Sequence, residues 1–199
     1  MPKIGTEPAR KAALITATIE EIGRAGSLDV PVSRIARRAG MSQALAHYYF
    51  DTKSEIFLAA MRHIMAAFSR QVIRELSESD SPRARLDAII TASFSPHQFA
   101  PDVVAAWLVF YVEAQHTPQV ARLLNVYTQR LNSNLVHALV PLVGAIEAPR
   151  VAETTGALID GLYIRQALRG AAPNASHARR LVSGVLDLEI SKNGVINEA

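Results

Sequence analysis

The stretch that decides the fold runs from Val30 to Lys53 and reads VPVSRIARRAGMSQALAHYYFDTK. It predicts a short helix, a tight turn at Gly40, a second short helix over 43–49 and the start of a third. Glycine suits the positive φ that a sharp turn between helices requires. Ser42 is placed to cap the second helix by accepting a backbone N–H. This is the pattern of a helix-turn-helix, whose second helix enters the major groove of DNA.

The outward side of the second helix carries small side chains and side chains that can donate hydrogen bonds. Gln43 is best placed for a base edge, whereas His47, Tyr48 and Lys53 are better placed for phosphates. The candidate DNA-binding residues are Arg34, Ser42, Gln43, Ala44, His47, Tyr48 and Lys53.

The net positive charge of the chain lies around this motif. Residues 1–53 contain eight Lys/Arg and five Asp/Glu, while the remainder holds thirteen of each, so the whole +3 excess falls in the first quarter. A basic surface is what a phosphate backbone requires. An excess of three charges could also arise by chance. The charge therefore supports DNA binding only because it coincides with the helix-turn-helix motif.

Three short segments of the motif resemble the N-terminal domain of the TetR family of bacterial transcriptional regulators: VSRIA at 32–36, AGMS at 39–42 and YYF-x-x-K at 48–53. Two positions depart from the family pattern. Pro31 stands where members usually carry Thr or Ser, and proline suits a helix start. The order His47-Tyr48-Tyr49 replaces the frequent Tyr-His-Tyr, which leaves open which side chain touches which phosphate. The resemblance implies a DNA-binding domain over 1–53 and a ligand-binding and dimerisation domain over 54–199.

Helical periodicity accounts for the rest of the chain. The apolar stripe Ala12, Ile15, Ile19 and Ile22 predicts an amphipathic helix from Pro8 to about Arg24 that ends at Gly26. No strand-like alternation follows, so the expected fold is all-α and TetR-like, with nine helices. Beyond the motif, the expected helices cover 53–76, 82–94, 101–116, 118–140, 149–169 and 174–190.

The expected helices over 101–116 and 149–169 are apolar on more than one side, which is typical of buried helices. Charged residues make up only 20% of the chain, a low share for a surface that is wholly in water. Both observations predict a homodimer with a two-fold four-helix interface. The residues that suggest it are Ala157, Leu158, Gly161, Leu162, Ile164, Leu168, Leu181, Val182, Val185 and Leu188.

Several function classes lack the residues they need. There is no cysteine, so disulfides and thiolate metal sites are excluded, and the six histidines show no metal-ligand spacing. No nucleophile elbow or phosphate-binding glycine loop is present, so we expect no enzyme, no cofactor and no metal. The N-terminus does not read as a signal peptide, and the uncharged run 131–146 is too short and polar to span a bilayer. We expect a cytoplasmic protein without a membrane partner.

One helical face predicts a ligand site. Trp107, Phe110 and Tyr111 share it, and each of the acids Glu113 and Asp160 stands alone in an apolar run. Aromatic faces with a nearby carboxylate suit a quaternary ammonium ion, which attracts the rings but offers no donor. The alternative is that the aromatics form ordinary core and the acids point to water. We expect the ligand to enter between this face and the helix over 53–76. The candidate ligand-binding residues are Trp107, Phe110, Tyr111, Glu113, Tyr127, Asp160 and Tyr163.

A narrower resemblance covers the start, the middle and the later part of the chain. MPKIG at 1–5, AWLVF at 106–110 and ALIDGL at 157–162 are similar to the BetI-type, choline-responsive repressors of betaine-synthesis genes. This resemblance implies that choline or betaine aldehyde relieves repression at double-stranded operator DNA. Two rivals stay open: a TetR-type repressor for another small apolar or cationic ligand, and a helical enzyme or carrier. The missing catalytic groups argue against the second.

Overall fold

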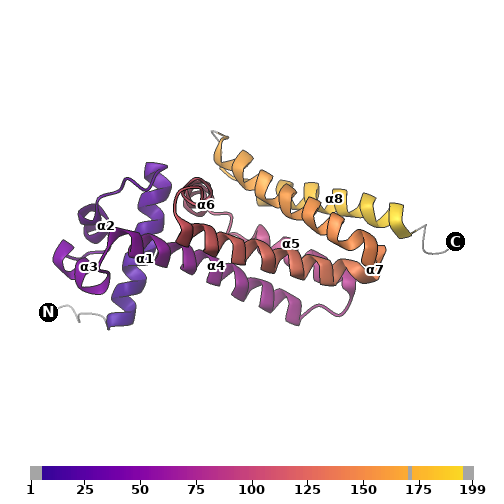
Figure 1. The fold of residues 1–199 in the computed structure, drawn as a ribbon, viewed down its shortest axis with the longest axis horizontal. Helices are drawn as coiled ribbons and strands as arrows, with labels where there is room; N and C mark the ends of the chain where they lie inside the picture. The colour runs from indigo at the N-terminus through magenta and orange to yellow at the C-terminus, as the bar shows by residue number, and fades with distance from the viewer. Residues whose placement is uncertain (1–5, 170–171, 195–199) are drawn as a thin grey trace.

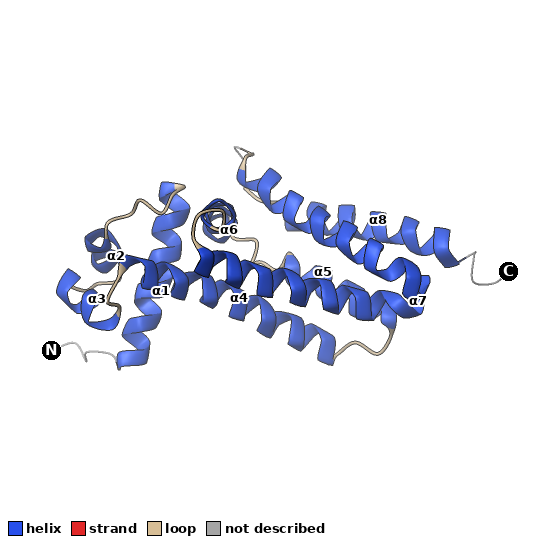
Figure 2. Cartoon of the chain, in the orientation of Figure 1, coloured by secondary structure: helices blue, strands red, loops and turns tan. Residues whose placement is uncertain are grey.

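The computed structural model describes residues 6–169 and 172–194, and in these ranges every regular element is a helix (Figure 2). The expected all-α fold is confirmed; the segment MPKIG at 1–5 lies outside the described residues. In chain order the helices are α1 Glu7–Ala25, α2 Val32–Arg38, α3 Gln43–Tyr49, α4 Lys53–Ser77, α5 Pro82–Ser93, α6 Pro101–Glu113, α7 Pro118–Ala167 and α8 Ala175–Gly194.

Helices α1, α2 and α3 form a head at one end of an elongated molecule (Figure 1). Gly40 turns the chain between α2 and α3 with φ of 69°. The Ser42 hydroxyl accepts the backbone N–H of Leu45 at 3.2 Å, which is the expected cap. Helix α3 is held from beneath by Ala46, which is fully buried. The helix-turn-helix prediction is therefore confirmed in its turn, its cap and its short second helix.

Helix α4 joins the head to the body. Thr52 caps it by accepting the backbone N–H of Glu55 at 3.2 Å. Its inner side buries Ile56, Ala60 and Ile64. It packs against α1 in the head and against α5 and α7 in the body.

A second contact between head and body passes through α6. Helix α1 packs against the start of α6, where the backbones come very close. A Cβ atom placed on Gly23 would lie 2.7 Å from the Cα of Asp102. A real Cβ contact is never so short, so only glycine fits at this position without displacing α6.

Helix α7 contains two helical segments. It is labelled as one element through Pro141 and Pro149, so the described residues carry eight helix labels where nine helices were expected. It is nevertheless broken at Gly144, where φ of 82° and ψ of 159° are far from helical. The chain reverses there, so residues 118–143 form a first arm and residues 145–167 a second arm that runs back beside α8 (Figure 1). Both prolines flank the break, so the backbone hydrogen bonds that proline cannot donate are missing near a helix end.

The body packs α5 between α4, α7 and α8, and the core is one continuous cluster that extends into the head. Helices α4 and α7 are long and apolar enough to cross a membrane by length and composition alone. Core helices pass the same test, and both α4 and α7 are partly buried within the molecule.

Candidate functional site

The outer face of α3 is a set of exposed side chains at the tip of the head. Ser42, Gln43, Ala44 and His47 are all exposed, and Tyr48 is 76% exposed. The Tyr48 ring contacts the Tyr49 ring edge-on, with 5.3 Å between centroids, and is otherwise open to water. These candidate DNA-binding residues therefore share one accessible surface, as the sequence predicts.

Lys53 lies beside this surface at the first turn of α4. Its side chain is half-exposed, with Nζ 3.8 Å from a carboxylate oxygen of Asp29. The same Nζ lies 5.4 Å from the ring centroid of Phe57. Both contacts hold the ammonium loosely, since the Asp29 side chain is fully exposed. The amine remains available to a phosphate.

Arg34 occupies a different position from the other candidates. Its guanidinium pairs with Glu21 of α1, and Arg38 pairs with the same carboxylate and with Glu20. The Glu21 side chain is almost fully buried. Burial acts to raise the pKa of Glu21, but hydrogen bonding from Arg38 and the positive charges of Arg34 and Arg38 lower it overall. The sequence pattern did not reveal this ion pair, which ties α2 to α1.

The predicted aromatic site is largely assembled in the body. The Trp107 ring lies 4.7 Å from the Tyr127 ring and 5.9 Å from the Tyr111 ring, measured between centroids. Trp107 is only 3% exposed, so it is also part of the core. Tyr127 in turn packs edge-on against Phe68 of α4 at 5.4 Å. Helices α4, α6 and the first arm of α7 thus meet at one aromatic cluster.

Asp160 brings a carboxylate to this cluster from the second arm of α7. The hydroxyl of Tyr111 donates to Oδ1 of Asp160 at 2.9 Å. Burial raises the pKa of Asp160, and the hydrogen bond from Tyr111 only partly opposes that rise. In the described part of the chain, no lysine or arginine pairs with Asp160. The carboxylate therefore has a hydrogen-bond donor but no counter-charge.

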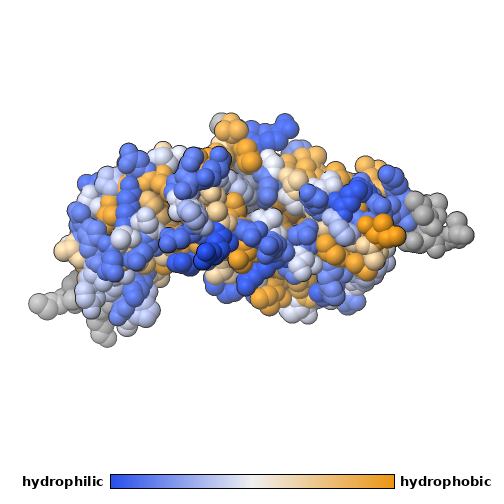
Figure 3. Space-filling view, viewed as in Figure 1, coloured by the Kyte–Doolittle hydropathy of each residue, from blue (hydrophilic) through white to orange (hydrophobic). Residues whose placement is uncertain are grey.

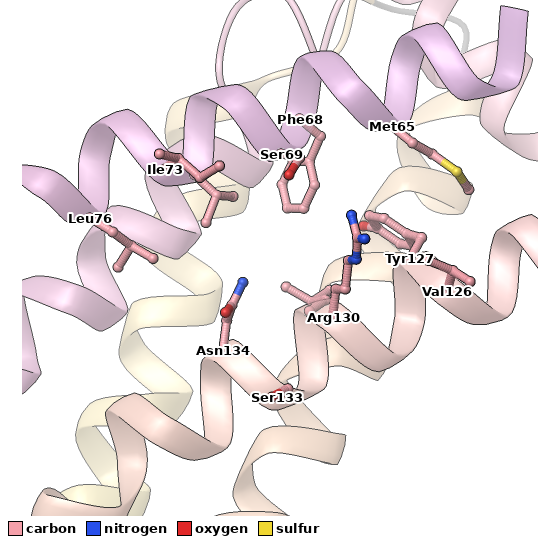
Figure 4. A pocket seen from close by; sticks show the side chains of 12 residues that line it. Met65, Phe68, Ser69, Ile73, Leu76, Val126, Tyr127, Arg130, Ser133 and Asn134 are labelled. Atoms are coloured by element: carbon pink, nitrogen blue, oxygen red, sulfur yellow. The ribbon is translucent and has the colours of Figure 1, made fainter. Parts of the chain in front are cut away.

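Two hollows lie on either side of Tyr127 and differ in charge. The inter-arm hollow, about 470 Å³, opens between the two arms of α7, and Asp160 and Glu153 are its charged lining residues. The α4–α7 hollow, about 330 Å³, is mainly apolar, and its only charged lining residue is Arg130 (Figure 4). A cation is favoured in the first and disfavoured in the second. Glu153 was not among the sequence candidates, although it precedes Asp160 by seven residues and therefore shares its helical face.

Three predicted ligand residues take other roles within the described structure. Phe110 is fully buried and, like Trp107 and Tyr111, lines neither hollow, and it has no contact with Asp160 among the described hydrogen bonds. The Tyr163 hydroxyl donates to the Ser93 carbonyl, and its ring packs in a separate aromatic cluster. Glu113 accepts a hydrogen bond from the Thr117 hydroxyl at the start of α7. Of the two candidate acids, Asp160 is the one that meets the aromatic cluster.

An apolar surface runs along the second arm of α7 and α8. Leu168 and Leu188 are each 74% exposed, and Leu181 is exposed as well. In Figure 3 the head is mostly hydrophilic, while apolar patches gather over the half of the molecule formed by α7 and α8. Val182, expected at the interface, is instead fully buried inside the chain, because α8 turns that side onto α7.

Comparison with known proteins agrees with this arrangement. Residues 14–60 match the bacterial regulatory proteins of the tetR family, and residues 82–191 match the C-terminal domain of BetI-type transcriptional repressors. The HTH-type transcriptional regulator BetI of Brucella melitensis is 48% identical over 191 residues, covering 96% of each chain. That of Agrobacterium fabrum is 46% identical over 190 residues, covering 96% of this chain and 92% of its own.

Solved structures share the whole fold. A transcriptional regulator from Saccharomonospora viridis in complex with choline superposes with a TM-score of 0.77 at 26% identity, covering 92% of this chain and 97% of its own. A regulator from Pseudomonas aeruginosa PAO1 gives a TM-score of 0.79 at 24% identity, covering 94% of this chain and 93% of its own. The second likeness concerns the fold alone.

Proposed function

The chain belongs to the TetR family and is a BetI-type transcriptional repressor, and we propose that choline or betaine aldehyde releases it from its operator by binding beside Asp160. It is a DNA-binding regulator rather than an enzyme. The genes under its control, in this proposal, are those that convert choline to glycine betaine.

The observation that carries the proposal is the meeting of Asp160 with the aromatic cluster of Trp107, Tyr111 and Tyr127. Burying a carboxylate without a cation is costly, and a cationic ligand removes that cost. A trimethylammonium group is attracted to the faces of aromatic rings and needs no hydrogen-bond acceptor. The choline bound to the Saccharomonospora viridis regulator supports the same ligand class.

The inter-arm hollow is a better entry for a cation than the space between α4 and the aromatic face, where we expected it. Its lining includes Tyr127 and Asp160 together, whereas the α4–α7 hollow presents Arg130. Repulsion by Arg130 disfavours an ammonium ion there. Tyr127 lines both hollows, so a ligand held against it also acts on α4 through Phe68.

We further propose a homodimer that joins through the second arm of α7 and α8, with residues 1–53 reading DNA and residues 54–199 binding ligand and partner. The exposed Leu168 and Leu188 support this face. Two heads are needed because one helix-turn-helix reads too little DNA, and their separation on DNA is about 34–36 Å. A ligand weakens DNA binding only if it binds more tightly to a state of the dimer in which the two heads have a different separation.

The test is fluorescence anisotropy with the DNA upstream of the protein's own gene. Choline or betaine aldehyde should release the complex, and the neutral carbon analogue of choline, with a tert-butyl group in place of trimethylammonium, should not. Equal release by the neutral analogue would favour the alternative of a repressor for a different apolar ligand. Failure to bind this DNA specifically would refute the operator assignment.

A further inference from the structure

A third hollow, of about 220 Å³, lies between α4 and the connection from α5 to α6, away from the aromatic cluster. Its charged and titratable lining residues are all basic. Helix α4 contributes His63, Ala67, Arg70, Gln71 and Arg74, and the connection contributes Ser95, His97 and Gln98.

The basic side chains converge because of helical spacing. Arg74 follows Arg70 by four residues, and Arg70 follows His63 by seven, so all three lie on one side of α4. His97 faces them from the connection. Glu75 accepts the side-chain amide of the lining residue Gln71 at 2.6 Å, but it does not itself line the hollow. Positive groups that converge without an acid repel one another unless an anion joins them.

The wall opposite α4 is fixed in place. Gln98 is buried, and its side-chain amide donates to the Ile64 carbonyl at 3.3 Å, which attaches the connection to α4. The Ser95 hydroxyl oxygen accepts the backbone N–H of Gln98 at 3.4 Å, so its own proton is free to donate into the hollow. Donors therefore face the hollow from both sides.

We propose that this hollow binds a tetrahedral oxyanion: a phosphate group, either free or as part of a small phosphomonoester. Guanidinium groups match the oxygen spacing of phosphate and form short, charge-assisted hydrogen bonds with it. The hollow is several times larger than the share of liquid volume of one water, about 30 Å³, so a phosphate fits.

The site is separate from the DNA-reading surface. Arg70 lies 17 residues after Lys53 on α4, which corresponds to about 25 Å of helix. The bound phosphate is therefore not that of the operator. It would connect α4 to the α5–α6 connection and add a contact between the linking helix and the body.

His63 makes the site sensitive to pH. Burial lowers the pKa of His63, and the positive charges of Arg70 and His97 lower it further. An anion has the opposite effect and favours the charged imidazole. Since Arg70 and Arg74 are always positive, anion affinity rises as the pH falls through the pKa of His63.

The experiment is isothermal titration of the full chain with inorganic phosphate, at constant ionic strength set by sodium chloride. Binding should be measurable, and after correction for the ionisation of phosphate itself it should be tighter below the lowered pKa of His63 than above it. The double variant Arg70→Gln/Arg74→Gln should lose about tenfold or more in affinity. Arg62→Gln is the matched control, since Arg62 is an exposed arginine of the same helix that does not line the hollow.

His97→Gln is a milder variant in case the double variant does not fold. It should weaken phosphate binding, because it removes a basic side chain from the lining. A parallel titration with glycerol phosphate separates the two sources: binding as tight as that of free phosphate identifies a phosphomonoester, and weaker binding identifies the free ion. No phosphate binding by the parent, or equal binding by the parent and the folded double variant or His97→Gln, would overturn the proposal.

Discussion

Replacing Asp160 with asparagine tests the ligand site because it removes the charge and keeps the shape. The Tyr111 hydroxyl, which donates to Asp160 at 2.9 Å, can still donate to the amide oxygen of the variant. Two unit charges about 4 Å apart attract by about 4 kcal/mol at an effective dielectric of 20 and by about 1 kcal/mol in water. Asp160 is partly buried at the edge of an open hollow, so we expect an intermediate value of about 2 kcal/mol. Choline affinity should fall about 30-fold.

Calorimetric titration with choline measures this loss, and the fluorescence of Trp107, the only tryptophan, gives an independent signal. Glu153→Gln is the matched control, because Glu153 lines the same hollow but is exposed to water. Glu153→Gln should lower the affinity for choline by less than about threefold. The neutral carbon analogue should bind Asp160→Asn as well as it binds the parent. The reasoning fails if Asp160→Asn binds choline like the parent, or if both variants lose affinity equally.

Protonation of Asp160 in the parent protein should weaken choline binding as the Asp160→Asn substitution does. The pKa of Asp160 is raised by burial, so its ionised form lowers the stability of the folded chain at neutral pH, and that cost disappears as the pH falls. Asp160→Asn should therefore unfold at a temperature equal to or above that of the parent near neutral pH. Choline affinity should decline on acidification through the raised pKa, and this decline should be absent in the variant.

Three further substitutions test the head and the assembly. Lys53→Ala should weaken binding to all DNA sequences alike and reduce the slope of affinity against salt by about one, and an unchanged slope would exclude a phosphate contact. Gly161→Glu should yield monomers in sedimentation and abolish operator binding; since a Cβ at Gly161 meets nothing within 4 Å in the single chain, a variant that stays dimeric would place the interface elsewhere. Glu21→Gln should destabilise the head by about 1–3 kcal/mol, because Arg34 and Arg38 lose the charge of their shared, almost fully buried partner, while both arginines stay partly in water and Arg38 keeps Glu20. The pKa of Glu21 is lowered, so this stabilisation is present above its ordinary pKa and is lost on acidification; parent-like urea unfolding at neutral pH would contradict it.

Local signals were enough to predict the head from the sequence. The positive φ of Gly40 and the cap at Ser42 depend on neighbouring residues only, so spacing predicts them well. The role of Arg34 could not be predicted in this way, because it depends on Glu21, thirteen residues earlier and on another helix.

The ligand site could be predicted in its chemistry but not in its position. Lone acids and clustered aromatics on apolar helices indicate a cation site, and Asp160 does accept a hydrogen bond from Tyr111, whose ring lies beside Trp107. Periodicity says which side of a helix is apolar but not which helix lies opposite. For that reason Phe110 and the inter-arm hollow could not be assigned before the structure.

The break at Gly144 lies almost midway along the chain between Tyr127 and Asp160. Tyr127 lies 17 residues before Gly144 and Asp160 lies 16 residues after it, so the reversal brings the ring and the carboxylate to the same height. Inserting or deleting one residue in either arm would rotate one partner by about 100° and shift it by 1.5 Å relative to the other. Descendants of this protein can therefore acquire new effectors by substitution along the arms, whereas a change of arm length would separate the two halves of the site.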